Sequence, residues 1–208
     1  MFVIYALRMG LAAACVWMTP EWPLTSHVSP LVQYVSKGII CSTSGFILAA
    51  LCSTILDIFP VISHRWKIQK NCHLSRNEYV HASMVSLFNL LVSSWLIYPI
   101  YIFSNLEEDD NSVIYWREGL KLLICAAVID IWFYCTHRVL HHYPILYSRI
   151  HKIHHRFSAP CAWACFYAHP IEFALGNVLG VALGPVITGT CPSTTYFWFA
   201  LATIISCT

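Results

Sequence analysis

Residues 120–155 read LKLLICAAVIDIWFYCTHRVLHHYPILYSRIHKIHH, an apolar run that leads directly into two groups of histidines. The apolar part, Leu120–Tyr134, has the composition of a membrane helix, although it is short because the histidines follow at once. The stretch therefore predicts a membrane helix whose end carries a histidine-rich segment to the membrane surface.

The rest of the chain is also apolar. Its 208 residues are 58% hydrophobic and 11% charged, and the mean hydropathy is +0.61. A soluble globular domain carries about 25% charged residues. We therefore expect an all-α integral membrane protein in which residues 1–208 form a single membrane domain. The net charge of +2 is small and scattered, which argues against nucleic acid as a partner.

Apolar runs long enough to be candidate membrane helices recur along the chain. We expect five of them, at Gly38–Ile62, Tyr79–Phe103, Leu120–Tyr134, Phe173–Gly189 and Thr194–Cys207. The last two flank a Pro-Ser turn and predict a membrane hairpin. The expected architecture is a bundle of about four to five membrane helices with a cytosolic histidine-rich helical segment. The role of residues 1–37 is left open, since residues 1–18 suit an anchor or an interfacial helix.

The loops between the first three predicted spans differ in charge. Ser63–Glu78 contains four basic residues and one acid, whereas Ser104–Glu118 contains five acids and one basic residue. The positive-inside rule places the first loop in the cytosol and the second on the opposite side. The third span then returns the histidines to the cytosol, where Arg138, Arg149, Lys152 and Arg156 accompany them.

Histidines concentrate in one part of the chain. Seven of the eleven lie between residues 137 and 169, and they form an HxxxHH pattern, an HxxHH pattern and one further histidine before Pro170. On an α-helix, His151, His154 and His155 span an arc of about 100°. The first pattern, His137, His141 and His142, spans about 140° on the same reckoning. Because Pro144 interrupts the chain between them, two short helices can turn their histidine faces together, and His169 can complete the ring.

This spacing predicts metal binding. One zinc ion takes four ligands in a structural site and three plus water in a catalytic site, so two metal ions would use the seven imidazoles better. Imidazole binds iron, copper and zinc alike, which leaves the element open. The membrane location favours iron, because a pair of irons can activate dioxygen beside an apolar pocket. An electrostatic patch for anionic lipids is the alternative, but it requires no helical spacing.

Other polar residues receive simpler interpretations. Metal-bound imidazoles usually donate their second N–H to a carboxylate or carbonyl, and we expect Asp130 or Glu172 in that role. A packing hydrogen bond is an equal alternative for Asp130.

Cysteines in the apolar runs are interpreted as reduced packing residues: Cys41, Cys52, Cys125, Cys135 and Cys207. The remaining histidines are interpreted as satisfied polar side chains at the membrane edge: His27, His64, His73 and His81.

Three short sequence motifs resemble those of a known enzyme superfamily. HRVLHH (137–142), HKIHH (151–155) and FYAHPIEF (166–173) resemble the fatty acid hydroxylase/sterol desaturase superfamily of membrane di-iron enzymes. The third motif is similar to a segment of the C4-methylsterol oxidases. Upstream, LDIFP (56–60) and RWKIQ (65–69) are similar to segments of the cholesterol 25-hydroxylase branch. The resemblance covers residues 56–172.

The resemblance implies an oxygenase of the endoplasmic reticulum membrane. It would couple dioxygen, and electrons from a separate donor of the cytochrome b5 or reductase type, to C–H hydroxylation of a sterol or other lipid in lipid biosynthesis. Two non-haem irons would be held by His137, His141, His142, His151, His154, His155 and His169. No further catalytic residue is implied. The family pattern continues into another histidine box, so we expect this chain to lack the C-terminal part of the domain.

Two other readings stay open. A sterol or lipid desaturase would use the same metal centre, because both reactions begin with hydrogen abstraction. A non-catalytic truncated form, or a metal-binding membrane protein, would not be an enzyme. A metal transporter places ionisable groups along a path through the membrane, whereas these histidines gather beyond the end of a span.

Overall fold

The computed structural model describes residues 2–17, 29–59, 74–93, 96, 98, 101–102, 115–157 and 161–207. Within these residues the regular structure is helical and contains no strand, which confirms the all-α prediction. The elements are α1 (Phe2–Trp17), α2 (Pro30–Ile58), α4 (Arg76–Ser93), α6 (Tyr115–His142), α7 (Pro144–Arg149), the 3₁₀ helices η2 (His151–Arg156) and η3 (Ala162–Ala164), α8 (Pro170–Glu172), the π-helix η4 (Phe173–Val178), α9 (Leu179–Thr188) and α10 (Pro192–Ser206).

Among the described residues, three helical stretches are long and apolar enough to cross a membrane. They are Pro30–Ile55, Trp116–His142 and Pro170–Thr188, and they match the first, third and fourth predicted spans. The predicted span Tyr79–Phe103 lies only in part within the described residues. The fifth, Thr194–Cys207, falls in α10, whose 15 residues extend about 22 Å and are too short to cross alone.

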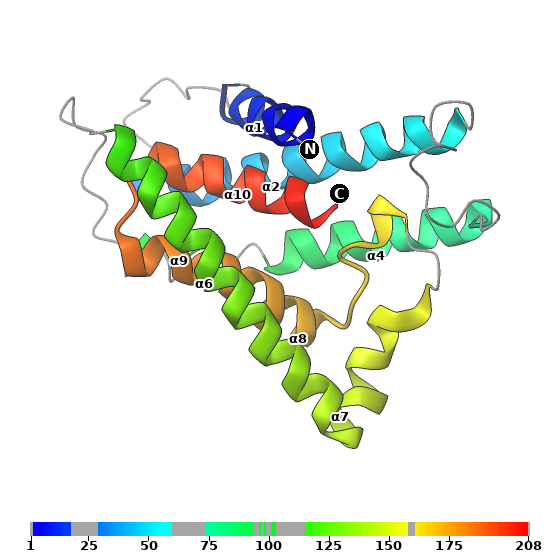
Figure 1. Cartoon of the computed structure of the whole chain (residues 1–208). Coiled ribbons are helices and arrows are strands. Elements are labelled where there is room, and N and C mark those ends of the chain that lie inside the picture. The colour runs from blue at the N-terminus through cyan, green and yellow to red at the C-terminus, as the bar shows by residue number, and fades with distance from the viewer. Residues whose placement is uncertain are drawn as a thin grey trace.

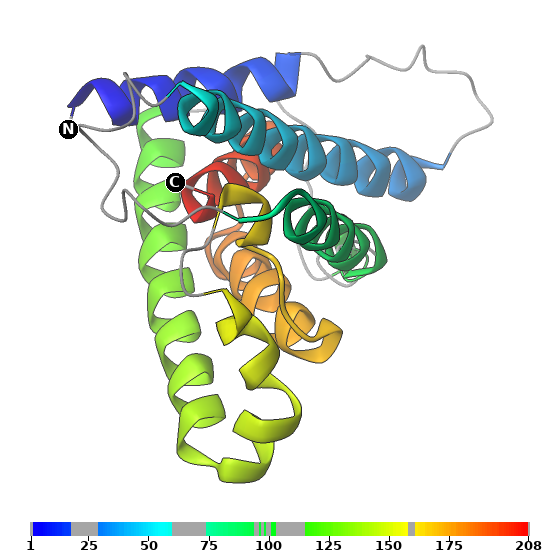
Figure 2. The same ribbon diagram turned by 90° about the vertical axis from the view of Figure 1, so that its right-hand side faces the viewer.

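The helices form two packed groups. Helix α10 packs against α2 and α1, and α6 packs against η4 and α9. In Figure 1, α6 runs diagonally away from the α1, α2 and α10 group and ends at α7. Figure 2, turned by 90°, shows α6 upright, with the segment of η4 and α9 that packs against it. The histidine segment therefore lies at the far end of α6, away from the layer of α1, α2 and α10.

Small residues on α9 let α6 approach closely. A Cβ on Gly180 would lie 2.8 Å from Cδ1 of Trp132, and one on Gly184 would lie 2.8 Å from the Cα of Cys125. This four-residue glycine spacing is typical of closely packed membrane helices. The indole N–H of Trp132 also donates to the carbonyl of Leu175 at 2.8 Å. These contacts set the face of α6 that meets η4 and α9.

Local signals determine the helix ends. Helix α2 begins at Pro30, eight residues before the predicted start at Gly38. Ser29 accepts the N–H of Val32 at 3.4 Å, and proline suits the first helical position because it has no N–H to leave unpaired. Helix α9 ends at Gly189, which adopts a left-handed φ of 59° that glycine reaches without strain.

Candidate metal centre

The four central histidines come from two elements that meet through a reversal of the chain. His137 and His141 lie one turn apart at the end of α6. Pro144 opens α7, and the chain then turns back into η2, which carries His151 and His155. The reversal brings η2 against the end of α6, as expected from the proline between the two patterns.

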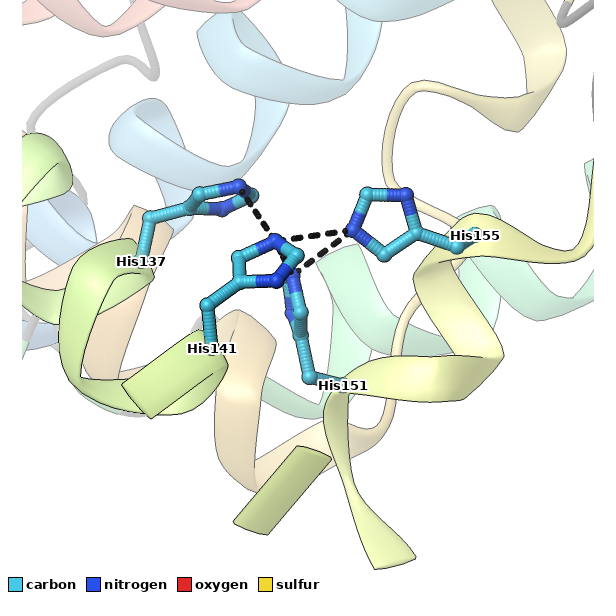
Figure 3. Close-up of side chains that lie close together, drawn as sticks. All are labelled: His137, His141, His151 and His155. Carbon is cyan, nitrogen blue, oxygen red and sulfur yellow. Dashed lines mark hydrogen bonds between the residues drawn. The ribbon is translucent and has the colours of Figure 1, made fainter. Parts of the chain in front are cut away.

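The Nε2 atoms of these histidines converge. Nε2 of His141 lies 3.2 Å from that of His137, 3.0 Å from that of His151 and 3.1 Å from that of His155. The His151 and His155 Nε2 atoms are 2.9 Å apart. All four ligand atoms lie within 4.8 Å of one another, and Figure 3 shows the rings pointing toward a common centre.

Glu172 contacts the nitrogen of His151 that points away from the other histidines. Its Oε1 lies 2.7 Å from Nδ1 of His151, and both side chains are buried. A neutral imidazole has one N–H, and an ionised carboxylate at this position favours the tautomer with that proton on Nδ1. In that tautomer, the Nε2 atom of His151 offers its lone pair toward the other rings. Sequence reasoning named Glu172 as one of two candidates for this role, and the geometry selects it.

Burial keeps His151 neutral. The side chain is 0% exposed, and desolvation, followed by the nearby imidazoles of His137 and His141, lowers its pKa to about 3. Burial also lowers the pKa of His154, with His155 as the next contribution. Both imidazoles are therefore neutral at pH 7, the form that binds metal.

The spacing of three of these nitrogens suits a bound cation. The Nε2 atoms of His141, His151 and His155 form a triangle with sides of 2.9–3.1 Å. Nitrogens bound to one ion at about 2.0–2.1 Å with bonds at right angles lie about 3.0 Å apart. The donor set therefore fits a single metal ion.

Three predicted ligands lie outside this group. His142 is exposed and contacts the ring of Tyr143. His154 is half-buried, with its ring centroid 5.5 Å from that of His155 and 5.6 Å from that of His151. His169 caps α8, where its Nδ1 accepts the N–H of Ile171 at 3.2 Å. His154 is thus near the four, whereas His142 and His169 make other contacts.

The second histidine pattern is not α-helical, contrary to the sequence prediction. Residues 151–156 form a 3₁₀ helix, and His155 departs from helical geometry with φ −84° and ψ 16°. Residues three apart eclipse one another in a 3₁₀ helix, so a regular turn would not place His151 and His155 together. The distortion at His155 restores their contact, and periodicity alone could not have revealed it.

Helix α4 holds the segment that leads to Glu172. The amide of Asn89 donates to the carbonyls of Phe166 at 2.9 Å and Ala168 at 2.8 Å. The hydroxyl of Ser86 donates to the carbonyl of Trp163 at 2.7 Å. Asn89 and Ser86 are fully buried. The roles of Asn89 and Ser86 were not predicted from the sequence. Polar residues inside an apolar helix are the signal that could have identified them.

The other histidines and the cysteines largely fit their simple interpretations. The Nε2 atom of His81 lies 3.0 Å from the hydroxyl oxygen of Tyr167. The same oxygen accepts a hydrogen bond from the guanidinium of Arg156 at 3.1 Å. The predictions for His27, His64 and His73 lie outside the described residues. The nine cysteines in the described part of the chain are free thiols. Asp130, the other candidate for orienting a ligand, lies at the wall of a cavity.

That cavity, of about 830 Å³, adjoins the histidines and extends along α6. His154, His155 and Glu172 line it near the metal-ligand candidates. Much of the remaining wall is apolar and comes from α6 and α10, including Ala126, Ile129, Phe133, Trp198, Ala202 and Ile205. An apolar ligand can therefore lie beside the converging nitrogens.

Comparisons with known proteins identify the family of this chain. A family model described as fatty acid hydroxylase matches residues 122–208. Sphinganine C4-monooxygenase 1 from Arabidopsis thaliana is 42% identical over 183 residues, which cover 87% of this chain and 66% of that protein. The chain belongs to the fatty acid hydroxylase/sterol desaturase superfamily. The sequence resemblance is thereby confirmed, and no solved structure matches the chain.

Further relatives in the superfamily carry different names. Fatty acid hydroxylase ahd1 from Mycosarcoma maydis is 33% identical over 188 residues, 86% of this chain and 48% of that protein. Methylsterol monooxygenase erg25B from Aspergillus fumigatus is 35% identical over 144 residues, 65% of this chain and 48% of that protein. The chain thus spans about half the length of these two relatives.

Proposed function

We propose that this protein is a membrane-bound non-haem di-iron oxygenase that hydroxylates a sterol or another lipid. The convergence of four imidazole nitrogens beside an apolar cavity carries the proposal. Two of the relatives described above are named as monooxygenases and one as a hydroxylase. Bound iron would supply the activation of dioxygen that attack on an unactivated C–H bond requires.

The ligand assignment follows the geometry. His137, His141, His151 and His155 would hold one iron. His154 is the best placed of the remaining candidates for a second iron, because its ring lies beside two of the four. The proposed set also includes His142 and His169. Glu172 would hold His151 in the tautomer that offers Nε2, a role that raises the basicity of a metal-bound imidazole.

The cavity wall favours a broad, apolar substrate. Small side chains line it on three elements: Ala126 and Ala127 on α6, Ala162 and Ala164 on η3, and Ala202 on α10. The cavity volume of about 830 Å³ lies in the range of pockets that hold a bulky ligand, which supports a sterol as the first substrate to test. We further propose that the protein resides in the endoplasmic reticulum membrane, that the histidines face the cytosol and that a separate protein donates electrons.

Isotope labelling tests this function. Membranes that contain the full-length protein are supplied with NADPH and a lipid extract under ¹⁸O₂, and the lipid products are analysed by mass spectrometry. We expect a sterol or lipid that has gained one labelled oxygen atom, and no such product from His141→Ala. A product that has lost two hydrogens without gaining label would indicate a desaturase instead. Equal product from wild type and variant would contradict the proposal.

A further inference from the structure

Asp130 stands out among the residues of α6. It lies near the middle of the candidate span Trp116–His142, where an ionisable side chain is costly and usually serves a function. It is exposed, and it lines the 830 Å³ cavity. Seven residues separate it from His137, which is two turns, or about 10 Å along the helix axis. A carboxylate therefore faces the cavity well inside the membrane.

Asn177 adds a second polar group to the same cavity. It lies in the π-helix η4, and such wide turns occur frequently at functional sites. It lines both the large cavity and a smaller one of about 60 Å³, and the two cavities share Ile129, Ala202 and Ser206. Elements α6 and η4 pack against each other. Asp130 and Asn177 thus border one space from two adjoining elements.

We propose that Asp130 and Asn177 form a polar subsite that binds the hydroxyl or ammonium group of the lipid substrate. This inference rests on the proposed function, because it takes the histidines as the place of reaction. Asp130 lies two helical turns, about 10 Å along the axis, before His137, and both the subsite and His154 and His155 border the same cavity. A lipid in this cavity can therefore reach the subsite with its polar group while another part of it lies beside the histidines.

The chemistry of the two side chains defines the ligand. An ionised carboxylate only accepts hydrogen bonds, whereas an asparagine amide both donates and accepts. A hydroxyl can donate to Asp130 and accept from Asn177. A lipid that lacks a donor makes no such hydrogen bond to Asp130 and binds less tightly. The pair therefore suits a polar group that can donate a hydrogen bond, an alcohol or an amine.

Binding to matched lipids tests the subsite without requiring activity. The iron-loaded full chain in detergent is titrated with cholesterol and cholestane, and with octadecan-1-ol and octadecane. We expect at least one alcohol to bind about tenfold or more tightly than its hydrocarbon, as expected for a hydrogen bond to a charged group. The pair that shows the preference identifies the lipid skeleton. Equal affinities within both pairs would overturn the proposal.

Variants assign the preference to the residues. Asp130→Leu should abolish the alcohol preference and leave hydrocarbon binding unchanged, and Asn177→Leu should reduce it. Glu78→Gln is the matched control, because that carboxylate caps α4 through Ser75 and lies outside the cavity lining. Retention of the preference in Asp130→Leu would refute the subsite. If the proposed function alone is wrong, the alcohol preference persists but no oxidised lipid forms.

Discussion

The two ends of α6 use polar residues in opposite ways. At the first end, Glu118 accepts from Lys121 at 2.6 Å and from the N–H of Cys191 at 3.2 Å, and Lys121 also donates to the carbonyl of Gly189 at 2.7 Å. Every contact there joins a donor to an acceptor. At the other end, the Nε2 atoms of three histidines face one another at 2.9–3.1 Å. The first end pairs each polar group within the protein, whereas the second gathers nitrogens that could bind a cation.

The comparison separates residues that stabilise the fold from residues that would bind metal. The network around Glu118 joins α6 to the turn between α9 and α10, so its loss should affect stability alone. The histidine end has exposed members, such as His141, whose loss should affect metal binding alone. Variants at the two ends therefore test whether stability and metal binding depend on separate residues.

The largest effect is expected at His141. Its Nε2 atom lies 3.0–3.2 Å from the Nε2 atoms of His137, His151 and His155. His141→Ala should lower the iron content of the purified protein at least about tenfold, because it removes the central ligand. The unfolding temperature of the metal-free protein should stay within a few degrees of wild type. Elemental analysis and thermal unfolding in detergent measure both quantities. Iron retained at the wild-type level would remove His141 from the site.

A smaller effect on metal binding is expected at Glu172. Glu172→Leu should weaken iron affinity by about 10–100-fold, because the carboxylate no longer fixes the tautomer of His151. Glu172→Gln keeps an acceptor for the Nδ1–H and should retain more affinity than the leucine variant. Competition with a chelator measures the affinities. If both variants bind as tightly as wild type, Glu172 does not orient the ligand.

At the opposite end, Glu118→Leu should lower the free energy of unfolding by about 1–3 kcal/mol, because Lys121 and the N–H of Cys191 lose their partner. Iron content per folded molecule should equal that of wild type. Denaturant unfolding in detergent and elemental analysis of the same sample give the two values. A loss of iron without a loss of stability would show that the two ends are not independent.

The last prediction concerns the pH dependence of the metal-free protein. The pKa of His151 is about 3 in the folded state and near 6.5 when unfolded. Between these values the unfolded state binds more protons, so stability falls as the pH falls from 6.5 toward 3, by up to about 1.4 kcal/mol per pH unit. The His151→Gln variant should show a slope shallower by that amount. Equal slopes would mean that His151 titrates normally in the fold.

Residues 120–155 predicted much of this arrangement. Hydrophobic length located the span that becomes α6. Histidine spacing selected seven residues, of which four converge at the end of that helix. Other features depend on contacts between distant segments. Glu118 was counted as part of an acidic loop, yet it lies inside α6 and is buried by the turn near Gly189.

Two further features that the sequence did not predict are the contacts of the α9 glycines and the backbone geometry at His155. The close approach of Gly180 and Gly184 to α6 could have been inferred from their spacing, but the helix that they face could not. The departure of His155 from helical geometry could not be predicted from periodicity, because a periodic pattern assumes regular helical turns.

X-ray absorption at the iron edge of the purified full-length protein tests the central claim most directly. The account predicts bound iron with nitrogen neighbours at about 2.0–2.2 Å and the outer-shell pattern of several imidazoles, both of which disappear in His141→Ala. Protein that carries stoichiometric zinc and no iron, or iron whose spectrum is unchanged in that variant, would contradict it.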